Sequence, residues 1–578
     1  MSLLTVVIFC AGAFLVAYRL YGAFLARAFR LDANAATPAV ELRDDLDYMP
    51  LEPRSLMSQH FSAIAAAGPI VGPILAGVMF GWLPALIWIV VGSIFIGGVH
   101  DMGALTASIR HRARSIAEVI REHMSRRSFV LFLIFVWLAL DYIIVAFTDI
   151  TAASFVGTIP LDNGQVVSGA GIATSSLLYL LLPVAMGLLI RFAKLPTAAA
   201  TIIFLPLLGV AIWAGQHIPL RLEEWFGVSS SQAHRTWNVI ILVYCFIASL
   251  LPVWALLQPR GHLGGYFLAL TLVGGAVGLI FSGDRAQYPA FIGWTARTGQ
   301  PLFPMLFIII ACGACSGFHA IIASGTTSKQ LRRETDARPI GYGAMLLEGM
   351  VAVVSLACVM RLAADSPHVV GDGAPKPNLL YAMGIGSFLE TLHVPAAFAV
   401  SFALMAFTTF VYDTLDVCTR LGRYIIEELT GWRTRSGRMV AAVLTAGAPL
   451  PFLLQQNFDA KGRLIPVWRV FWELFGASNQ LLAALTLLGV TVWLWRTRRS
   501  LTLLMVTGIP TVLMYVMSTW ALLRIASIEF SRHGSSGSSV GWVSLVLLAL
   551  AAMMLVDAVV VLLVGKKQSI RRASPIVA

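Results

Sequence analysis

The stretch that decides the fold is residues 305–330, MLFIIIACGACSGFHAIIASGTTSKQ. It begins as an apolar helix and fills with small and polar residues before Lys329. Hydroxyls and an imidazole at membrane depth are costly unless they face protein or a wet cavity, and glycines allow a helix to unwind. We therefore expect a discontinuous membrane helix that lines a binding site; the alternative is a tight helix–helix contact with satisfied hydroxyls. Its candidate substrate-binding residues are Gly313, Ser316, Gly317, His319, Ser324 and Thr326.

Composition places the whole chain in a membrane. Of 578 residues, 58% are hydrophobic and 12% charged, and the mean hydropathy is +0.81. A soluble protein carries about twice that charged fraction, so we expect an all-α polytopic membrane protein. The net charge of +12 does not indicate a nucleic-acid partner, because the basic residues sit in short loops beside apolar segments. Cys312 and Cys315 have C-x-x-C spacing without a second ligand pair, so we expect no metal and no cofactor.

Apolar runs long enough to span the bilayer predict about fifteen transmembrane helices. They lie near residues 3–29, 61–81, 82–109, 128–147, 172–190, 196–214, 237–257, 263–281, 301–323, 340–364, 395–419, 438–455, 477–495, 501–525 and 541–565. If the chain starts outside and alternates, 29 of its 41 Lys and Arg residues fall on one side and 11 on the other, and Arg19 lies within the first helix. This asymmetry predicts an external N-terminus and a cytoplasmic C-terminus, with the segment 566–572 and the loop residue Arg260 on the cytoplasmic side.

A second interrupted segment follows the first span. Gly68-Pro69 and Gly72-Pro73 punctuate residues 60–77, and each proline leaves a carbonyl without its helical donor. Two interrupted helices running in opposite directions are typical of inverted-repeat transporters; two unrelated kinks are the alternative. We expect 68–73 and 313–317 to be non-helical and to meet near the midplane, and Gly68, Pro69 and Gly72 to contact substrate.

The repeat hypothesis divides the chain into five parts. They are an N-terminal helix and loop (1–60), a first five-helix repeat (61–214), two accessory helices (215–300), a second five-helix repeat (301–495) and a C-terminal accessory part (496–578).

Several ionisable residues lie within the predicted spans, where carboxylates indicate proton or cation sites. The candidates for ion coupling are His100, Asp101, Asp141, Asp413 and Asp416, and Glu348 lies within the tenth span. The alternative is strongest for Asp416, which could pair with Arg420 one turn later.

Asn479 and Gln480 stand near the predicted start of the thirteenth span, after an aromatic stretch at 455–475 that we interpret as an interfacial or re-entrant helix. They could cap that helix start, or offer neutral hydrogen-bonding groups to a ligand. None of the central spans shows a midplane Arg or Lys, so we expect backbone dipoles and His319 to hold an anionic substrate.

These motifs carry a family resemblance between about residues 50 and 490. FSAIAAAGPIVGPILA, GGVHDMGALTASIRHRARSIAEVI, ACGACSGFHAIIASGTTSKQ, FGASNQLLAAL and the D-x-x-D-x-x-T-R run from Asp413 to Arg420 together resemble the carbon starvation protein A family. The resemblance implies a bacterial inner-membrane secondary transporter related to the amino acid–polyamine–organocation superfamily. It also implies uptake of peptides during carbon starvation, or of pyruvate with protons. His100 stands before Asp101 where some relatives are expected to have a neutral residue such as Gln.

Function follows from the broken helices and the buried carboxylates. They favour an importer of a small peptide or carboxylate, coupled to a proton or another cation, and the chain has no Walker loop for direct use of ATP. A membrane nutrient sensor is an alternative. An intramembrane hydrolase built on Ser316 and His319 is disfavoured, because two residues three apart on one helix give poor geometry for attack. We expect no enzymatic activity.

Overall fold

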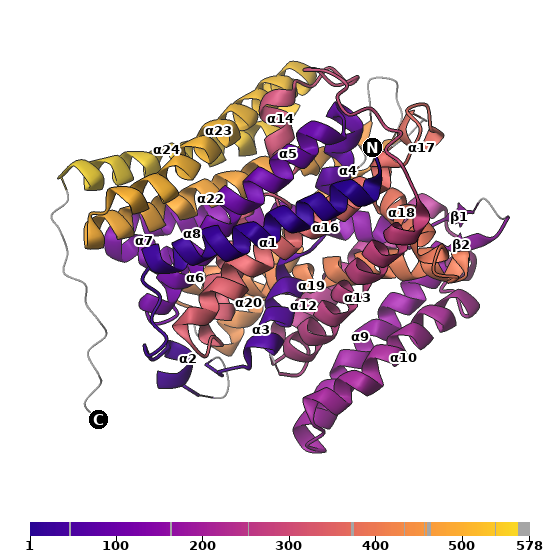
Figure 1. The fold of residues 1–578 in the computed structure, drawn as a ribbon, viewed down its shortest axis with the longest axis horizontal. Coiled ribbons are helices and arrows are strands. Elements are labelled where there is room, and N and C mark those ends of the chain that lie inside the picture. Colours follow the sequence, from indigo (N-terminus) through magenta and orange to yellow (C-terminus); the bar gives the residue numbers. More distant parts are fainter. Residues whose placement is uncertain are drawn as a thin grey trace.

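The computed structural model describes residues 1–564 except 45–47, 162–163, 253, 371–374, 433, 456, 459–463 and 538. The segment 566–572, predicted to be cytoplasmic, lies outside the described residues. The described chain is a bundle of long helices (Figure 1). Thirteen of its helices are long and apolar enough to cross a membrane, and a bent pair adds a fourteenth. The all-α polytopic class is confirmed.

The helices of the first half of the described chain are α1 (Leu3–Ala28), α2 (Pro38–Glu41), α3 (Pro53–Ile64), α4 (Gly68–Phe80), α5 (Trp82–Gly92), the π-helical η1 (Ser93–Gly97), α6 (Gly98–Arg110), α7 (Ile116–His123), α8 (Arg126–Ala153), α9 (Gly169–Phe192), α10 (Thr197–His217), α11 (Leu222–Phe226), α12 (Ser230–Leu250) and α13 (Leu257–Ser282). Those of the second half are α14 (Leu302–Ile309), α15 (Gly317–Gly325), the 3-10 turns η2 (Thr327–Lys329) and η3 (Glu334–Asp336), the π-helical η4 (Arg338–Gly343), α16 (Ala344–Met360), α17 (Pro367–Val370), α18 (Pro377–Glu390), α19 (Ala396–Thr430), α20 (Arg435–Gly447), α21 (Leu450–Leu454), α22 (Val467–Arg498), α23 (Leu501–Gly537) and α24 (Ser539–Val564).

Two short antiparallel hairpins interrupt the helical pattern in loops: β1 (Thr158–Pro160) pairs with β2 (Val166–Ser168), and β3 (Asn457–Phe458) pairs with β4 (Leu464–Ile465). The aromatic stretch at 455–475 was expected to form an interfacial or re-entrant helix. Its part from Val467 onward instead belongs to α22, which runs unbroken from Val467 to Arg498. Its small residues do not break it. A Cβ at Gly476 would collide with the carbonyl of Ile308, so this glycine lets α14 pack closely.

The buried share of each helix shows which helices lie at the centre of the bundle. The apolar stretch of α22 is entirely buried and that of the η3–α16 segment is 89% buried, whereas the figures for α1, α10 and α23 are 33% and for α24 28%. The latter helices form the periphery, and the α9–α10 hairpin stands at one edge of the bundle (Figure 1). Their exposed apolar side chains are the surface that lipid would cover.

Two broken spans cross in this centre. α3 and α4 are bent by 46° at residues 65–67, and α14 and α15 are separated by residues 310–316. A Cβ at Gly68 would collide with Cys312, and one at Gly72 would lie 2.5 Å from the Ile309 carbonyl oxygen. Residue numbers rise along one span as they fall along the other, so the two run antiparallel, as the inverted-repeat prediction requires.

The exact break in the first span differs from the prediction. Residues 68–73 are helical, with Pro69 in the first turn of α4 and Pro73 inside the helix. A proline in the first turn loses no helical hydrogen bond, because that N–H has no intrahelical partner. Gly68-Pro69 therefore starts a helix, and the break lies immediately before it. The break predicted at 313–317 is found, with Gly317 as the first residue of α15.

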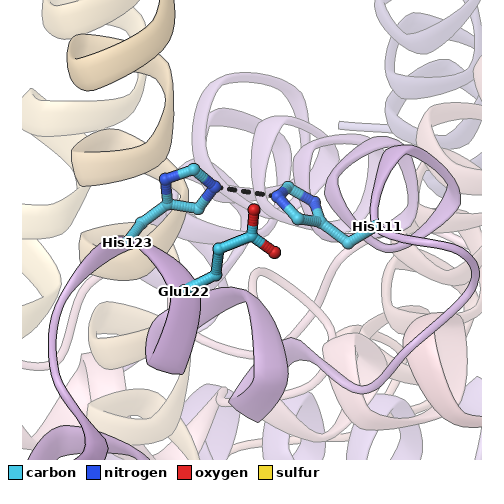
Figure 2. A group of neighbouring side chains, drawn as sticks. All are labelled: His111, Glu122 and His123. Atoms are coloured by element: carbon cyan, nitrogen blue, oxygen red, sulfur yellow. Dashed lines mark hydrogen bonds between the residues drawn. The ribbon is translucent and has the colours of Figure 1, made fainter. Parts of the chain in front are cut away.

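A π-helical turn occurs in the helical segment that follows each broken span. η1 precedes α6, and η4 precedes α16. Single π turns are frequent at functional sites. Beyond α6, a turn with positive φ at Arg112 (62°) and Ala113 (52°) leads into α7 and brings His111 beside His123 (Figure 2).

Candidate functional site

The unwound segment 310–316 needs hydrogen-bond partners for its backbone, because no water is available at membrane depth. Side chains of neighbouring helices supply them. The Ile310 carbonyl accepts from Trp88 Nε1 (3.2 Å) and from Gln480 Nε2 (3.4 Å). The Gly313 carbonyl accepts from Ser93 Oγ at 3.0 Å. Side chains of α5, η1 and α22 therefore stabilise the non-helical conformation of this segment.

Asn479 completes this arrangement from the middle of α22. Its Oδ1 accepts from the backbone N–H of Phe318 at 2.9 Å, and its Nδ2 donates to Ser316 Oγ at 3.0 Å. The expectation that Asn479 and Gln480 stand at the start of their own helix is wrong, since α22 begins at Val467. Asn479 caps the first turn of α15 instead.

A buried group of titratable side chains surrounds the start of α15; we call it the His319 cluster (His100, Asp101, His319 and Glu348). Asp101 Oδ1 lies 2.7 Å from His100 Nδ1, and Asp101 Oδ2 lies 2.8 Å from His319 Nδ1. The other ring nitrogen of His319 lies 3.1 Å from Glu348 Oε2. All four side chains are fully buried. His100 and Asp101, candidates for ion coupling, are thus brought together with His319, a candidate for substrate binding, and Glu348 joins them.

The imidazole of His319 sits between two carboxylates contributed by α6 and α16. A neutral imidazole can donate from one nitrogen only, whereas an imidazolium donates from both. With both carboxylates ionised and His319 protonated, these three groups carry a net charge of −1, and one further proton makes them neutral. The arrangement can therefore hold or release a proton in a site closed to water.

The polar ridge predicted along α15 does not act as one surface. Ser324 Oγ donates to the Ala320 carbonyl and accepts from the backbone N–H of Ile116 at 3.2 Å, so it faces α7. Thr326 lies further on, beside a cavity of about 20 Å³, roughly the room of one water molecule. This cavity is lined by Gln59, His60, Ala63, Leu257, Gly261, Ile322, Thr326, Thr327, Asp413 and Val417.

Asp413 and Asp416 belong to a second buried group, the Arg260 cluster (Ser62, Tyr244, Arg260, Asp413 and Asp416). Arg260 Nε lies 2.6 Å from Asp413 Oδ1, and Arg260 Nη1 contacts Asp416 Oδ2. Asp416 also accepts from Tyr244 Oη at 2.8 Å, and Asp413 accepts from Ser62 Oγ. The side chain of Arg260 is 1% exposed.

One prediction and one alternative about this cluster are wrong. Arg260 is in the first turns of α13 rather than in a loop, and supplies the buried cation that the spans were expected to lack. Asp416 pairs with Arg260 and not with Arg420, whose Nη2 donates to the carbonyls of Ala248 (2.8 Å) and Leu251 (2.7 Å) at the end of α12. The physical reason is that a buried carboxylate pair needs a partner of opposite charge at its own depth.

Asp141 is not brought into either cluster. It lies on α8 with its side chain buried, and its Oδ1 has no hydrogen-bond partner among the described residues. The sequence does not show the roles of His60, Arg260 or Glu348. His60 Nδ1 lies 2.9 Å from Thr327 Oγ1 beside the cavity. One feature of the sequence could have indicated these residues. The predicted spans contain several carboxylates, and buried carboxylates need basic partners nearby.

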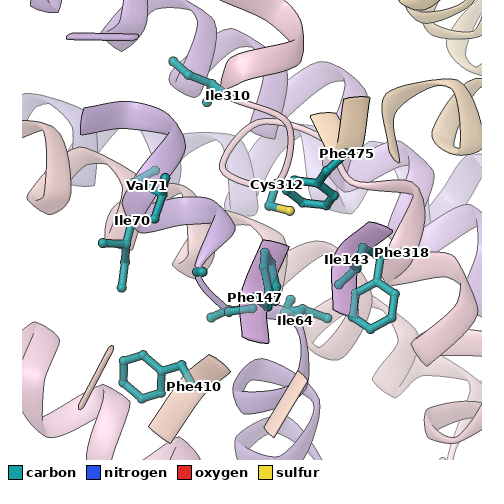
Figure 3. Close-up of a cluster of buried hydrophobic side chains, with 14 of the residues drawn as sticks. Ile64, Ile70, Val71, Ile143, Phe147, Ile310, Cys312, Phe318, Phe410 and Phe475 are labelled. Atoms are coloured by element: carbon teal, nitrogen blue, oxygen red, sulfur yellow. The ribbon is translucent and has the colours of Figure 1, made fainter. Parts of the chain in front are cut away.

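Apolar side chains gather around the two breaks (Figure 3). They come from α3 and α4, from α8, from the segment 310–318, and from α19 and α22. The labelled ones are Ile64, Ile70, Val71, Ile143, Phe147, Ile310, Cys312, Phe318, Phe410 and Phe475, and all are buried. The polar clusters thus flank a mostly apolar centre.

Several known proteins are similar to this chain. The chain is 32% identical to the pyruvate/proton symporter BtsT of Escherichia coli, over 92% of this chain and 83% of that protein. It is 32% identical to the peptide transporter CstA of Helicobacter pylori, over 86% of this chain and 78% of that protein. The crystal structure of MhsT in complex with L-phenylalanine aligns at 11% identity and a TM-score of 0.47, covering 81% of this chain and 99% of that one. The family model of the carbon starvation protein CstA matches residues 2–372 and 368–521. The chain therefore belongs to the carbon starvation protein CstA family.

Proposed function

We propose that this chain is a proton-coupled symporter that imports a small nutrient, either a short peptide or a pyruvate-like carboxylate, across the bacterial inner membrane. The observation that carries this proposal is the His319 cluster at the broken helix. Two relatives support it, since one is a pyruvate/proton symporter and the other a peptide transporter.

The coupling proton resides in the His319 cluster. Its members come from three elements that meet at the break: α6 carries Asp101, α15 carries His319 and α16 carries Glu348. A change in the angle of α15 would alter both contacts of His319 at once. Proton occupancy and helix position are then linked, which is the requirement for coupled transport.

The Arg260 cluster serves a different purpose. Asp413 and Asp416, proposed from the sequence as alternative coupling residues, are both held by Arg260 on α13. They therefore join α13 to α19 as an ionic connection. The small cavity is lined by both Asp413 and His60, so a single water there could hydrogen-bond to both side chains.

Substrate binds at the two breaks, where the N-terminal end of α4 packs against the unwound segment 310–316. Helix N-termini favour negative charge, so a substrate carboxylate would lie near Gly68, Pro69 and Gly72 on one side and Gly313 and Gly317 on the other. The apolar side chains of Figure 3 would contact the rest of the substrate. Asn479 and Gln480 then act indirectly, because their side chains hold the unwound segment in place.

The distribution of basic residues supports an external N-terminus and a cytoplasmic C-terminus. Accessibility labelling of single cysteines introduced at the two termini would check this orientation, because external reagent should reach only the N-terminal one.

The proposal is tested with purified protein in liposomes. Labelled pyruvate and a panel of di- and tripeptides should include at least one compound that accumulates when the outside is more acidic, with the accumulation lost when a protonophore collapses the gradient. Failure of every compound, or accumulation indifferent to the protonophore, would overturn the proposed function.

A further inference from the structure

The turn between α6 and α7 carries a group of potential metal ligands away from both buried clusters. His111, Glu122 and His123 each offer one ligand atom, and these atoms lie within 4.8 Å of one another. The two imidazoles approach through their Nε2 atoms, which are 2.8 Å apart, and the carboxylate of Glu122 points to the same place (Figure 2). We propose that this group binds a divalent transition-metal ion, with Zn²⁺ as the representative ion.

The surroundings of His111 prepare it as a ligand. Its Nδ1 lies 2.6 Å from the carbonyl oxygen of Ala107, which can only accept a hydrogen bond. The hydrogen of the neutral ring is therefore on Nδ1, and Nε2 presents its lone pair to the site.

The backbone around the site is fixed on both sides. The turn after His111 includes two residues with positive φ and is closed by the hydrogen bond from Ala113 N to the Ser108 carbonyl at 2.8 Å. The carbonyl of His123 accepts from Arg496 Nη1 at 2.7 Å, which ties the end of α7 to the end of α22. The ring of Trp493 packs edge-on against His111. Two ligands are thus held before any ion binds.

Two of the positive charges close to the site are paired with carboxylates. Arg110 Nε lies 2.6 Å from Glu334 Oε1, and Arg114 Nη1 lies 3.9 Å from Glu118 Oε2. Glu122 supplies a negative ligand and is exposed, so an ion can enter from solvent and keep a water as its fourth ligand.

The ligand set specifies the class of metal. Two imidazoles and one carboxylate suit Zn²⁺ and similar ions better than Mg²⁺ or Ca²⁺, which prefer oxygen ligands. Two Zn–N bonds of about 2.0–2.1 Å at the tetrahedral angle place the nitrogens about 3.3 Å apart. The two Nε2 atoms would move apart by about 0.5 Å. The hydrogen between them, which belongs to His123 Nε2, would be displaced by the ion. The bound ion would then bridge the end of α6, the helix that carries Asp101, to α7.

The experiment measures metal binding by the full-length protein in detergent, purified with an affinity tag that contains no histidine. We expect about one Zn²⁺ per chain by elemental analysis after desalting. A Co²⁺ titration should give visible absorption typical of a four-coordinate ion. Mg²⁺ at the same concentration should not compete.

The variants locate the site. H111A and H123A should weaken Co²⁺ binding at least tenfold, the scale seen even for residues that only support a ligand. Glu122 is exposed, so E122Q should fold even if a histidine variant does not, and it then provides the test of the site. E122Q should also weaken binding. The matched control is H217A, because His217 makes the same Nδ1 contact to a carbonyl four residues earlier, that of Trp213 at 2.8 Å, at the end of α10. Equal binding in wild type and H111A, equal loss in H217A, or no binding by wild type would overturn the proposal.

Discussion

Replacement of Arg260 by methionine tests the buried ionic connection between α13 and α19. The change keeps much of the side-chain volume and removes the cation that Asp413 and Asp416 share. Because Arg260 is 1% exposed, water cannot take over its role. Removal of one partner from a buried ion pair costs about 3–5 kcal/mol, so R260M should lower the free energy of unfolding by this amount.

A charge-neutral background separates this electrostatic cost from lost packing. In D413N/D416N no buried carboxylate remains for Arg260 to neutralise. The R260M change should therefore cost far less stability in the D413N/D416N background than it costs in the wild type. The matched control is R361M. Arg361 Nε lies 3.5 Å from Asp284 Oδ2 and both side chains are more than a quarter exposed, so its removal should cost at most about 1 kcal/mol. Thermal unfolding in one detergent compares all variants. Equal losses in R260M and R361M, or an undiminished loss in the neutral background, would refute the reasoning.

The remaining predictions concern the two breaks. N479A removes the partner of the Phe318 N–H and of Ser316 Oγ, so it should cost about 1–3 kcal/mol of stability; a thermal shift no larger than that of a surface alanine variant would contradict this. G72A places a methyl group 2.5 Å from the Ile309 carbonyl oxygen, whereas G209A meets nothing within 4 Å. Fluorescence-detected size-exclusion chromatography should therefore show a lower folded yield for G72A and none of this loss for G209A; equal yields would contradict the close crossing of the two spans.

The positions of the spans could be predicted from hydropathy, because each needs about twenty apolar residues whatever its neighbours are. Breaks within the spans were harder to predict than the spans themselves, as the segment 301–323 and the helix α22 show together. The glycines and hydroxyls of 301–323 predicted the break that separates α14 from α15. The same kind of composition around Gly476 does not break α22, because there the small residue makes room for the Ile308 carbonyl. Close packing and unwinding use the same residues, and only the neighbouring element distinguishes them.

The candidate site was predictable in part for a similar reason. His100, Asp101 and His319 stood out because each is costly inside a membrane. The contacts of His319 with Asp101 and with Glu348 join residues far apart in the chain, which no local pattern specifies. Arg260 was assigned to a loop because it lies between the predicted spans 237–257 and 263–281. Its partners lie on α19, more than 150 residues later, so its burial could not be read from its own surroundings.

The central claim is that the His319 cluster carries the coupling proton, and Glu348 gives the most direct test. E348Q keeps the shape of the side chain and a hydrogen-bonding group beside His319 Nε2 but removes the carboxylate. The matched control is E473Q, because Glu473 lies on α22, also in a spanning helix, and bonds to Gln300 rather than to the cluster.

The measurement compares two modes of transport in the same liposomes, with a substrate identified for the wild type. Wild type and E473Q should accumulate it when the outside is acidic and should exchange internal for external substrate without a gradient. E348Q should still exchange substrate, because binding and helix movement remain possible, and should lose accumulation driven by the pH gradient. Full gradient-driven accumulation by E348Q would contradict the account.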